Sequence, residues 1–283
     1  MTQDPDTRIS TQEPQATTPV QKLVIGVTFH FDGKRLGFLQ RTAKNFAQLS
    51  QSTKVFVVTN TESPEEQKLI KEAVGTDTEL VVPTHLGHPY LLTWGHFDRF
   101  RELFQADTSL SHFLYLEDDI EIKLDNLNYW LRAREELRST GLIPSFLRYE
   151  VKEGEAEMRS TDVTSQFELK KLPKVQLKGR EYCYINFPEP YQGMYFLDRE
   201  LAQEHLFGES SSPDFGRWGI REKAAQGLTF AQVPKNCFSR NFVGFHRGTN
   251  SIDPRALIHH LPNNYANNPE SKHGKIPIRE LVI

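Results

Sequence analysis

Cysteine is scarce in this chain of 283 residues. Only two are present, Cys183 and Cys237, and neither belongs to a Cys-x-x-Cys spacing. This scarcity argues against a disulfide framework and against a structural zinc site built from cysteines. An excess of positive charge is also missing, because 34 Lys plus Arg stand against 37 Asp plus Glu, a net charge of -3. We therefore expect no nucleic-acid partner.

Long apolar runs are lacking as well. No stretch reaches the roughly 18 residues that a membrane-spanning helix needs. The first segment, "MTQDPDTRISTQEPQATTPV", is rich in Thr, Gln, Pro and Asp and has no apolar core of a signal peptide. The composition predicts a disordered tail over residues 1–20 and a single domain over 21–283. We expect a cytoplasmic protein without a transmembrane segment, and peripheral membrane contact stays open.

Apolar runs alternate with amphipathic segments in the first half of the chain. The pattern predicts strands over 22–31, 53–60, 78–85 and 112–122, separated by helices over 35–50, 63–75 and 91–105. In the second of these helices, Ser63 is placed as the N-cap and Pro64 at the first helical position. Apolar strands alternating with helices indicate an α/β fold with a mostly parallel sheet covered on both faces. The strands' carboxyl ends then meet at one edge, where ligands bind.

The second half has a more mixed pattern. A helix is predicted over 125–141, and the charged, strand-like pieces of 145–178 predict β-hairpins in an added layer or flap. Residues 191–206 predict a strand followed by a helix, and residues 212–230 a loop that leads into a helix. The remaining C-terminal stretch is expected to be largely irregular.

Three consecutive acids end the fourth predicted strand, in "HFLYLEDDIEI". Adjacent carboxylates raise one another's pKa unless a cation or solvent relieves them, and oxygen ligands of this kind suit Mg²⁺ or Mn²⁺. We expect the strand to continue to Ile122, which places Glu117 and Asp119 on one side and Asp118 on the other. A solvated acidic turn and a helix N-terminus are the alternatives.

The alternating first half followed by "LYLEDDIEI" resembles the GT-A class of glycosyltransferases, whose DxD motif holds Mn²⁺ or Mg²⁺ against the diphosphate of a nucleotide-sugar. The motif here is Glu117-Asp118-Asp119, with Glu in place of the first Asp. The resemblance implies a GT-A-like, Rossmann-like fold with a β-rich acceptor-side flap. Residues 21–125 form the nucleotide-binding half and 126–283 the acceptor-binding half. It makes Asp119 the direct metal ligand and places Glu117 and Asp118 on the metal, the ribose or the sugar.

Two later segments are similar to the same class. In "PYQGMYFLDRELAQEHL", Gly193 lets the backbone approach the acceptor sugar. In "FGRWGIREKAAQG", Trp218 and Gly219 precede Glu222, which the resemblance makes the catalytic base of an inverting transfer to an acceptor hydroxyl. Asp214 competes with Glu222 for that role, and Trp218 either stacks on the acceptor or packs in the core.

The resemblance also implies further contacts with metal and donor. His260 and His246 are the candidates for an additional metal ligand, with His260 preferred. Arg247 is expected to neutralise the leaving diphosphate. The remaining donor-binding candidates follow the first and second strands or lie on the third helix: Thr28, Phe29, Asn60, His96 and Arg99.

Two other classes remain as alternatives. A sugar nucleotidyltransferase normally carries a Gly-rich, basic phosphate loop after its first strand, whereas "TFHFDGKR" has one Gly. A non-catalytic carbohydrate-binding protein would keep Trp218 as a stacking surface but would not bind a donor. The expected partners are therefore a nucleotide-sugar and a carbohydrate, lipid-linked or other hydroxyl acceptor.

Overall fold

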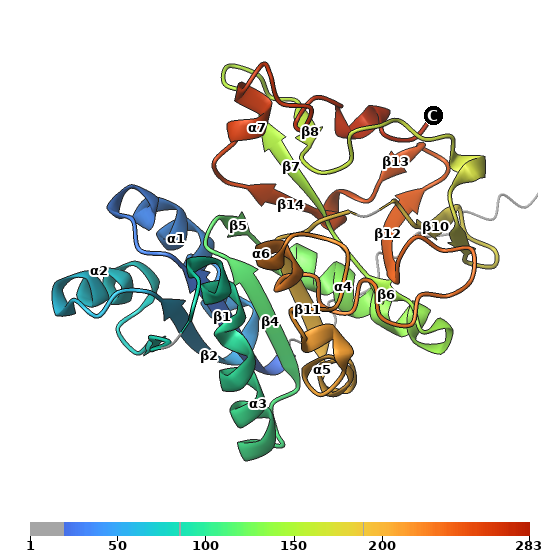
Figure 1. The fold of residues 1–283 in the computed structure, drawn as a ribbon. Coiled ribbons are helices and arrows are strands. Elements are labelled where there is room, and N and C mark those ends of the chain that lie inside the picture. The colour runs from blue at the N-terminus through green and yellow to red at the C-terminus, as the bar shows by residue number, and fades with distance from the viewer. Residues whose placement is uncertain (1–19, 85, 189) are drawn as a thin grey trace, which may run out of the picture.

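The computed structural model of the protein describes residues 20–84, 86–188 and 190–283. The predicted tail, apart from Val20, lies outside these residues. A five-stranded sheet in the order β3-β2-β1-β4-β11 lies at the centre (Figure 1). Its strands are β1 (Val20–Phe29), β2 (Ser50–Thr59), β3 (Glu79–Val81), β4 (His112–Glu117) and β11 (Met194–Asp198). The first four strands are parallel, and β11 pairs with β4 in the antiparallel direction.

Helices cover both faces of this sheet. On one face Phe100 packs edge-to-face against Phe113, and on the other Trp130 packs against His112. Because successive side chains of a strand point to opposite faces, α3 and α4 lie on opposite sides of β4. The helices are α1 (Leu36–Ala43), α2 (Pro64–Val74), α3 (His96–Ala106), α4 (Leu124–Leu137), α5 (Arg199–Leu206), α6 (Ile220–Lys223) and α7 (Asn264–Asn267). The predicted α/β fold is confirmed.

Two smaller sheets make up the added β-rich part (Figure 1). One has the order β13-β12-β10-β9, with β6 paired to β12, and the other the order β5-β14-β7-β8. The pairs β7–β8 and β9–β10 are antiparallel, which confirms the predicted hairpins. The strands are β5 (Ile120–Glu121), β6 (Ile143–Pro144), β7 (Leu147–Val151), β8 (Met158–Ser160), β9 (Lys174–Gln176), β10 (Tyr182–Ile185), β12 (Asn241–His246), β13 (Ser251–Ile252) and β14 (Leu257–His260).

Three expectations about elements are wrong. The strand predicted over 112–122 ends at Glu117, and Asp118 and Asp119 form a turn before β5 joins a different sheet. The C-terminal stretch is not irregular, because β12 and β14 are buried strands that pair with strands distant in sequence. The helix expected after Gly219 is the single turn α6.

The helical segments of the first half match their predicted places. Ser63 caps α2 by accepting a hydrogen bond from the backbone N–H of Glu66 at 3.4 Å, and Pro64 opens the helix. The third predicted helix is divided into a 3-10 turn, η3 (Pro89–Trp94), and α3. In the described part of the chain, none of the helices has both the length and the apolar character that crossing a bilayer requires.

Candidate active site

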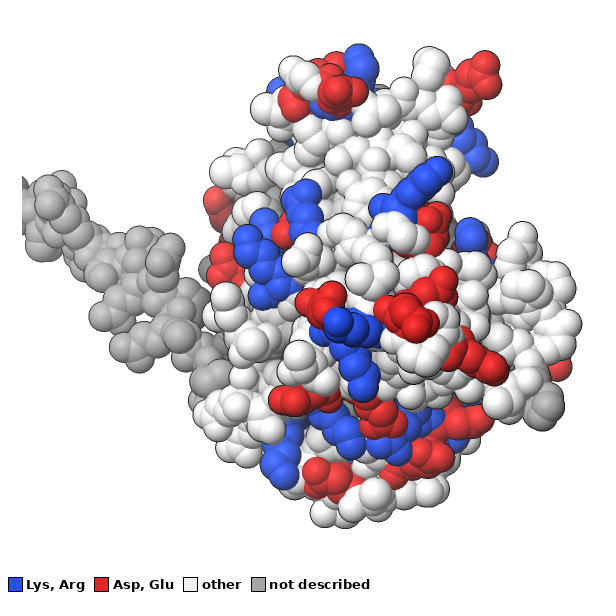
Figure 2. Space-filling model, turned by 90° about the vertical axis from the view of Figure 1, so that its left-hand side faces the viewer, with Lys and Arg blue, Asp and Glu red and all other residues white. Residues whose placement is uncertain are grey.

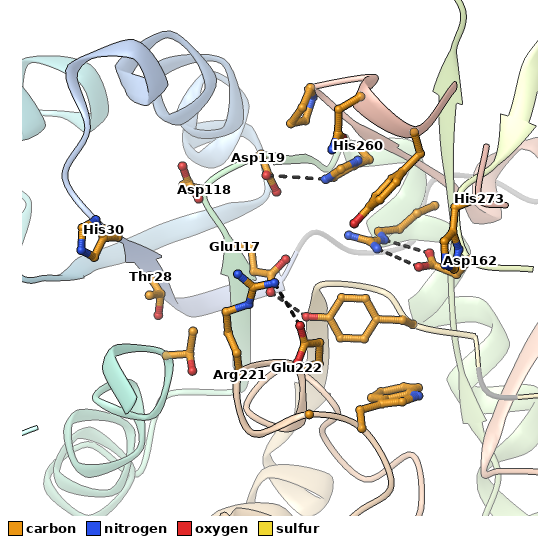
Figure 3. Close-up of a pocket in the computed structure, with 18 of the residues that line it drawn as sticks. Thr28, His30, Glu117, Asp118, Asp119, Asp162, Arg221, Glu222, His260 and His273 are labelled. Atoms are coloured by element: carbon orange, nitrogen blue, oxygen red, sulfur yellow. Dashed lines mark hydrogen bonds and ion pairs between the residues drawn. The ribbon is translucent and has the colours of Figure 1, made fainter. Parts of the chain in front are cut away.

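A cavity of about 840 Å³ lies at the carboxyl ends of β1 and β4 (Figure 3). The loop after β1, which contains the 3-10 turn η1 (Gly33–Arg35), and the acidic turn after β4 form one side. The segment around α6 lies across the cavity, and the end of β14 brings His260 next to Asp119. This position agrees with the rule that open α/β sheets bind ligands beyond the carboxyl ends of their strands.

All three acids of the cluster line this cavity. Arg35 donates two hydrogen bonds of 2.8 Å to the two carboxylate oxygens of Asp118 and one of 2.8 Å to Oδ2 of Asp119. Burial and the charge of Asp119 raise the pKa of Asp118, and the paired Arg35 opposes that rise. The expectation that Asp118 points away from Asp119 is wrong, because the turn brings both carboxylates to one guanidinium.

Asp119 is the least satisfied of the three acids. Its Oδ1 atom is buried and has no hydrogen-bond partner, while Oδ2 lies 3.6 Å from Nε2 of His260. Burial opposes ionisation, but the hydrogen bond and charge of His260, together with Arg35, lower the pKa of this carboxyl. An ionised, buried oxygen without a partner, on a residue that lines a cavity, is a position that a cation or a donor group can satisfy.

Glu117 is held by the segment that precedes β11. The hydroxyl of Tyr191 donates to its Oε1 atom at 2.6 Å, and Arg148 lies 4.7 Å above the Tyr191 ring. Burial and the charge of Asp119 raise the pKa of Glu117 to about 7. Gly193 has a φ of 64°, and a Cβ there would lie 3.0 Å from Oε2 of Glu117. Gly193 therefore leaves room for this carboxylate.

The segment around α6 faces the acids across the cavity (Figure 3). Arg221 donates to Oε1 of Glu222 at 3.0 Å, and the Glu222 side chain is 34% exposed. The ring of Trp218 packs edge-to-face against Tyr191. The indole N–H of Trp94, at the end of η3, donates to the Ile220 carbonyl at 2.8 Å and ties this segment to the chain that precedes α3.

The cavity lining is acidic overall. Five carboxylates stand against three guanidiniums, a formal net charge of -2 when every carboxylate is ionised and the histidines are neutral. The residues are Glu117, Asp118, Asp119, Asp162 and Glu222, and Arg35, Arg148 and Arg221. The surface face shown in Figure 2 instead carries positive and negative side chains interspersed. The negative excess inside the cavity favours a cationic ligand or cofactor.

A second cavity of about 390 Å³ shares His30 with the first. It is lined by Asn60, at the end of β2, and by the chain from Leu86 to Pro89. The Oδ1 atom of Asn60 accepts from the Phe31 backbone N–H at 2.7 Å, which fixes the loop after β1. Thr28 lines the larger cavity and accepts a hydrogen bond of 3.1 Å from the Tyr115 hydroxyl.

Three predicted donor-binding residues lie elsewhere. Phe29 is fully buried in the core. His96 is also fully buried, and its two ring nitrogens bond the Thr93 carbonyl and the Tyr195 hydroxyl. Burial lowers the pKa of this imidazole. Arg99 pairs with Glu79 at 2.7 Å on the surface of α3. These side chains do not line the cavity, so the expectation that they contact the donor does not agree with their positions.

Three further candidates are also outside the cavity. His246 lies 3.8 Å from Asp253 and packs edge-to-face on Tyr182, in the sheet that contains β12. Arg247 is exposed just beyond that strand, and Asp214 is exposed in the loop before Trp218. Of the two alternative histidines and the two alternative bases, the structure therefore brings only His260 and Glu222 to the acids.

Several residues that line the cavity or lie directly behind its lining were not predicted from the sequence. Arg35 could have been found, because it follows the first strand and so lies at the ligand-binding edge. Arg148 and Glu150 alternate in β7 and therefore share a buried face, a signal that the mixed composition of this segment obscured. Tyr191 and Asp162 depend on contacts between distant segments, which no local pattern reveals.

Within the described residues, no group of three or more His, Cys, Asp or Glu side chains is arranged to hold a metal ion by itself. Asp119 and His260 form a pair instead of a cluster of three. Any cation at this position would need further ligands from water or from a bound substrate. Mg²⁺ and Mn²⁺ sites that handle phosphates are commonly completed in this way.

Comparisons with known proteins give little further information. No protein-family model matches the chain, and no curated protein matches its sequence. Among solved structures, the chain is similar to a CMP-2-keto-3-deoxy-manno-octonic acid synthetase complexed with CTP. The TM-score is 0.37 and the identity 14%, over 65% of this chain and 77% of that one. A likeness this weak carries no argument about fold or function.

Proposed function

We propose that this protein is a glycosyltransferase of the GT-A type, which moves a sugar from a nucleotide-diphospho-sugar to an acceptor hydroxyl. The observation that supports this most is Asp119, whose ionised carboxylate keeps one buried oxygen without a partner in a cavity at the sheet edge. Neither a structural ion pair nor a core position accounts for that oxygen. A ligand-binding role does, because buried polar atoms are nearly always satisfied.

The residues present fit a divalent cation. Asp119 and His260 offer one carboxylate and one imidazole 3.6 Å apart, and the cavity carries a formal net charge of -2. A mixed oxygen and nitrogen pair suits Mn²⁺ better than Mg²⁺. When bound, the cation would supply positive charge next to the diphosphate, and diphosphate oxygens would complete its ligands.

The donor is proposed to lie across the two adjacent cavities. Thr28 is near the end of β1, Asn60 follows the parallel neighbour β2, and His30 borders both spaces. The smaller cavity has room for a planar nucleobase beside Asn60, and the larger one for the sugar and diphosphate. Arg221 reaches the larger cavity, where it can donate hydrogen bonds to phosphate oxygens.

Glu222 is the proposed general base. It faces the acids from α6 and is partly exposed, so an acceptor hydroxyl can approach it. The hydroxyl proton moves to Glu222 as the oxygen forms a bond with the anomeric carbon. The bond from that carbon to the diphosphate oxygen breaks, and its electron pair leaves with the nucleoside diphosphate. Attack from the face opposite the leaving group inverts the anomeric centre.

One observation favours a sugar nucleotidyltransferase as the second candidate. Arg35, in the loop after β1, lies in the cavity beside the acids, where a nucleotidyltransferase needs a basic group for its triphosphate. The loop has a single Gly, Gly33, and the guanidinium of Arg35 is already paired with Asp118. These two features favour sugar transfer over nucleotidyl transfer.

The test is product analysis with Mn²⁺ present. The protein is incubated with UDP-, GDP- and CMP-sugars, and separately with CTP or UTP and free sugars or sugar phosphates. The proposal predicts release of nucleoside diphosphate from a nucleotide-sugar, raised by acceptor alcohols. Pyrophosphate released from a triphosphate would show the second candidate instead. If none of the nucleotide-sugars changes the melting temperature, the protein does not bind a donor, and the carbohydrate-binding alternative is favoured.

A further inference from the structure

A fully buried carboxylate stands behind His260. Glu150, on β7, is 0% exposed, and its Oε1 atom lies 2.5 Å from Nδ1 of His260. Its Oε2 atom accepts a hydrogen bond of 2.6 Å from the Ala266 backbone N–H, at α7. In the part of the chain that the structure describes, the ion-pair partner of Glu150 is His260.

The sheet order explains how the three side chains come together. Strand β14 lies between β5 and β7, with His260 paired to Ile120 and His259 paired to Tyr149. Because β14 and β7 are parallel, the residues that follow His259 and Tyr149, which are His260 and Glu150, are also neighbours. One residue before Ile120 is Asp119, so β14 carries His260 into the space between the two carboxylates.

Burial makes a purely structural role for Glu150 costly. An acid removed entirely from water costs several kcal/mol unless its partners compensate, and a neutral or apolar residue usually fills such a position more cheaply. Both oxygens of Glu150 are used, one by the imidazole and one by a backbone N–H. Because a carboxylate only accepts hydrogen bonds, Nδ1 of His260 must be the donor.

The consequence lies on the other side of the ring. Although burial opposes it, the two neighbouring carboxylates raise the pKa of His260, and the charged ring carries a proton on both nitrogens. In the neutral ring the proton stays on Nδ1 beside Glu150, so Nε2, 3.6 Å from Oδ2 of Asp119, presents its lone pair. The contact is drawn in Figure 3. Two electron-rich atoms at this distance are an arrangement that a cation between them relieves. Carboxylate-bound histidines that present the opposite nitrogen to a metal are a general means of fixing ring orientation.

We propose that Glu150 is a positioning residue that fixes His260 in its Nδ1-protonated tautomer, so that Nε2 is presented with Asp119 to a divalent cation. This deepens the proposed function and rests on it for the identity of the ligand. Glu150 does not line the cavity and touches no substrate.

The substitution Glu150→Gln gives a sharp test because its two neighbours impose the amide orientation. The Ala266 N–H needs an acceptor, so the amide oxygen takes the place of Oε2 and the NH₂ group faces Nδ1 of His260. The ring must then accept at Nδ1 and carry its proton on Nε2. The lone pair that would face the cation is lost without a change in side-chain volume.

Two measurements on the full chain test the inference. ¹⁵N NMR at alkaline pH reports which ring nitrogen of His260 carries the proton, in the absence of metal. Electron paramagnetic resonance reports the affinity for Mn²⁺ alone. We expect Nδ1–H in the wild type, Nε2–H in Glu150→Gln, and an affinity for Mn²⁺ about 10- to 100-fold lower in the variant.

Glu121→Gln is the matched control. Glu121 is a buried acid of the same sheet whose Oε2 atom lies 3.8 Å from Nδ1 of His259, the neighbouring histidine. Its replacement removes the same charge without touching His260, so the tautomer and the Mn²⁺ affinity are expected to stay as in the wild type.

The outcomes separate this inference from the proposed function. An Nε2–H tautomer in the wild type overturns the inference even if the variant does not fold. Equal Mn²⁺ affinities in wild type and folded Glu150→Gln also overturn it. If the wild type has the Nδ1–H tautomer, the variant switches it and neither protein binds Mn²⁺, the positioning role holds and the metal-assisted function fails.

Discussion

At the scale of single residues, the site is defined by carboxylates that differ in their surroundings. Asp118 is paired with Arg35, and Asp119 keeps an oxygen without a partner. Burial and the charge of Asp119 raise the pKa of Glu117 to about 7. Three neighbours in sequence thus have three electrostatic environments. The burial of Asp119 and its contact with His260 single it out for binding a cation.

Glu222→Gln is expected to lower kcat about 10²- to 10⁴-fold, because the amide cannot accept the acceptor's proton. Donor binding is expected to stay close to the wild-type value, since the substitution leaves Asp119 and His260, the proposed cation ligands, unchanged. The measurement is steady-state kinetics combined with donor titration. Asp214→Asn is the control and is expected to retain activity, because Asp214 is exposed outside the cavity. The reverse pattern would make Asp214 the base.

At the scale of elements, the parallel strands and their helices were predictable because their patterns are long and regular. Each predicted strand of the first half falls on one of β1 to β4, and the cap at Ser63 is confirmed. Of the missed C-terminal strands, β13 and β14 have two and four residues, too few for a period to show, whereas β12 has six and its apolar run did carry a strand signal. For β13 and β14, pairing with other strands, not their own sequence, makes them extended.

The candidate site could be predicted only in part for the same reason. The acids follow a strand of clear apolar pattern, so their place at the sheet edge was predictable. His260 could not be separated from His246 by sequence, because the choice depends on β14 lying between β5 and β7. Arg35 meets the acids only through the parallel pairing of β1 with β4.

The loop after β1 supplies a prediction about cation binding. Arg35→Met leaves Asp118 and Asp119 without their guanidinium, at an expected cost of about 1–3 kcal/mol. This is below the value for a fully buried pair, because the Arg35 side chain is 35% exposed. Mn²⁺ is expected to raise the melting temperature of this variant more than that of the wild type, since the cation replaces a missing positive charge.

Arg41→Met is the matched comparison for this experiment. Arg41 pairs with Glu121 at 3.3 Å and does not line the larger cavity. Its removal is expected to leave the Mn²⁺ response at the wild-type value. An equal rise in melting temperature with Mn²⁺ in wild type, Arg35→Met and Arg41→Met would show that the cation does not bind at Asp118 and Asp119.

At the scale of the whole molecule, buried histidines predict sensitivity to acid. Burial lowers the pKa of His112 to about 4 and that of His205 to about 3, and it lowers the pKa of His96 well below its ordinary value. Below pH 6.5 the unfolded chain binds protons that the folded chain refuses, so stability falls as pH drops from about 6.5 towards 4. The loss at pH 5 is on the order of 2 kcal/mol per histidine.

The measurement compares wild type with His112→Gln by chemical denaturation at pH 7 and pH 5. Glu117 and Asp118, whose pKa values are raised, titrate in the opposite sense, so the difference between the two proteins isolates His112. The variant is expected to lose less stability over this interval than the wild type. Identical losses would mean that His112 is solvated enough to titrate normally.

The proposed metal site is tested most directly by calorimetric titration of wild type and Asp119→Asn with a nucleoside diphosphate, each with and without Mn²⁺. We expect the wild type to bind the nucleotide tightly only with Mn²⁺, and Asp119→Asn to lose this dependence while keeping the wild-type melting temperature. Equal, metal-independent binding in both proteins would contradict the proposed metal site and would remove the acidic turn from the chemistry of the cavity.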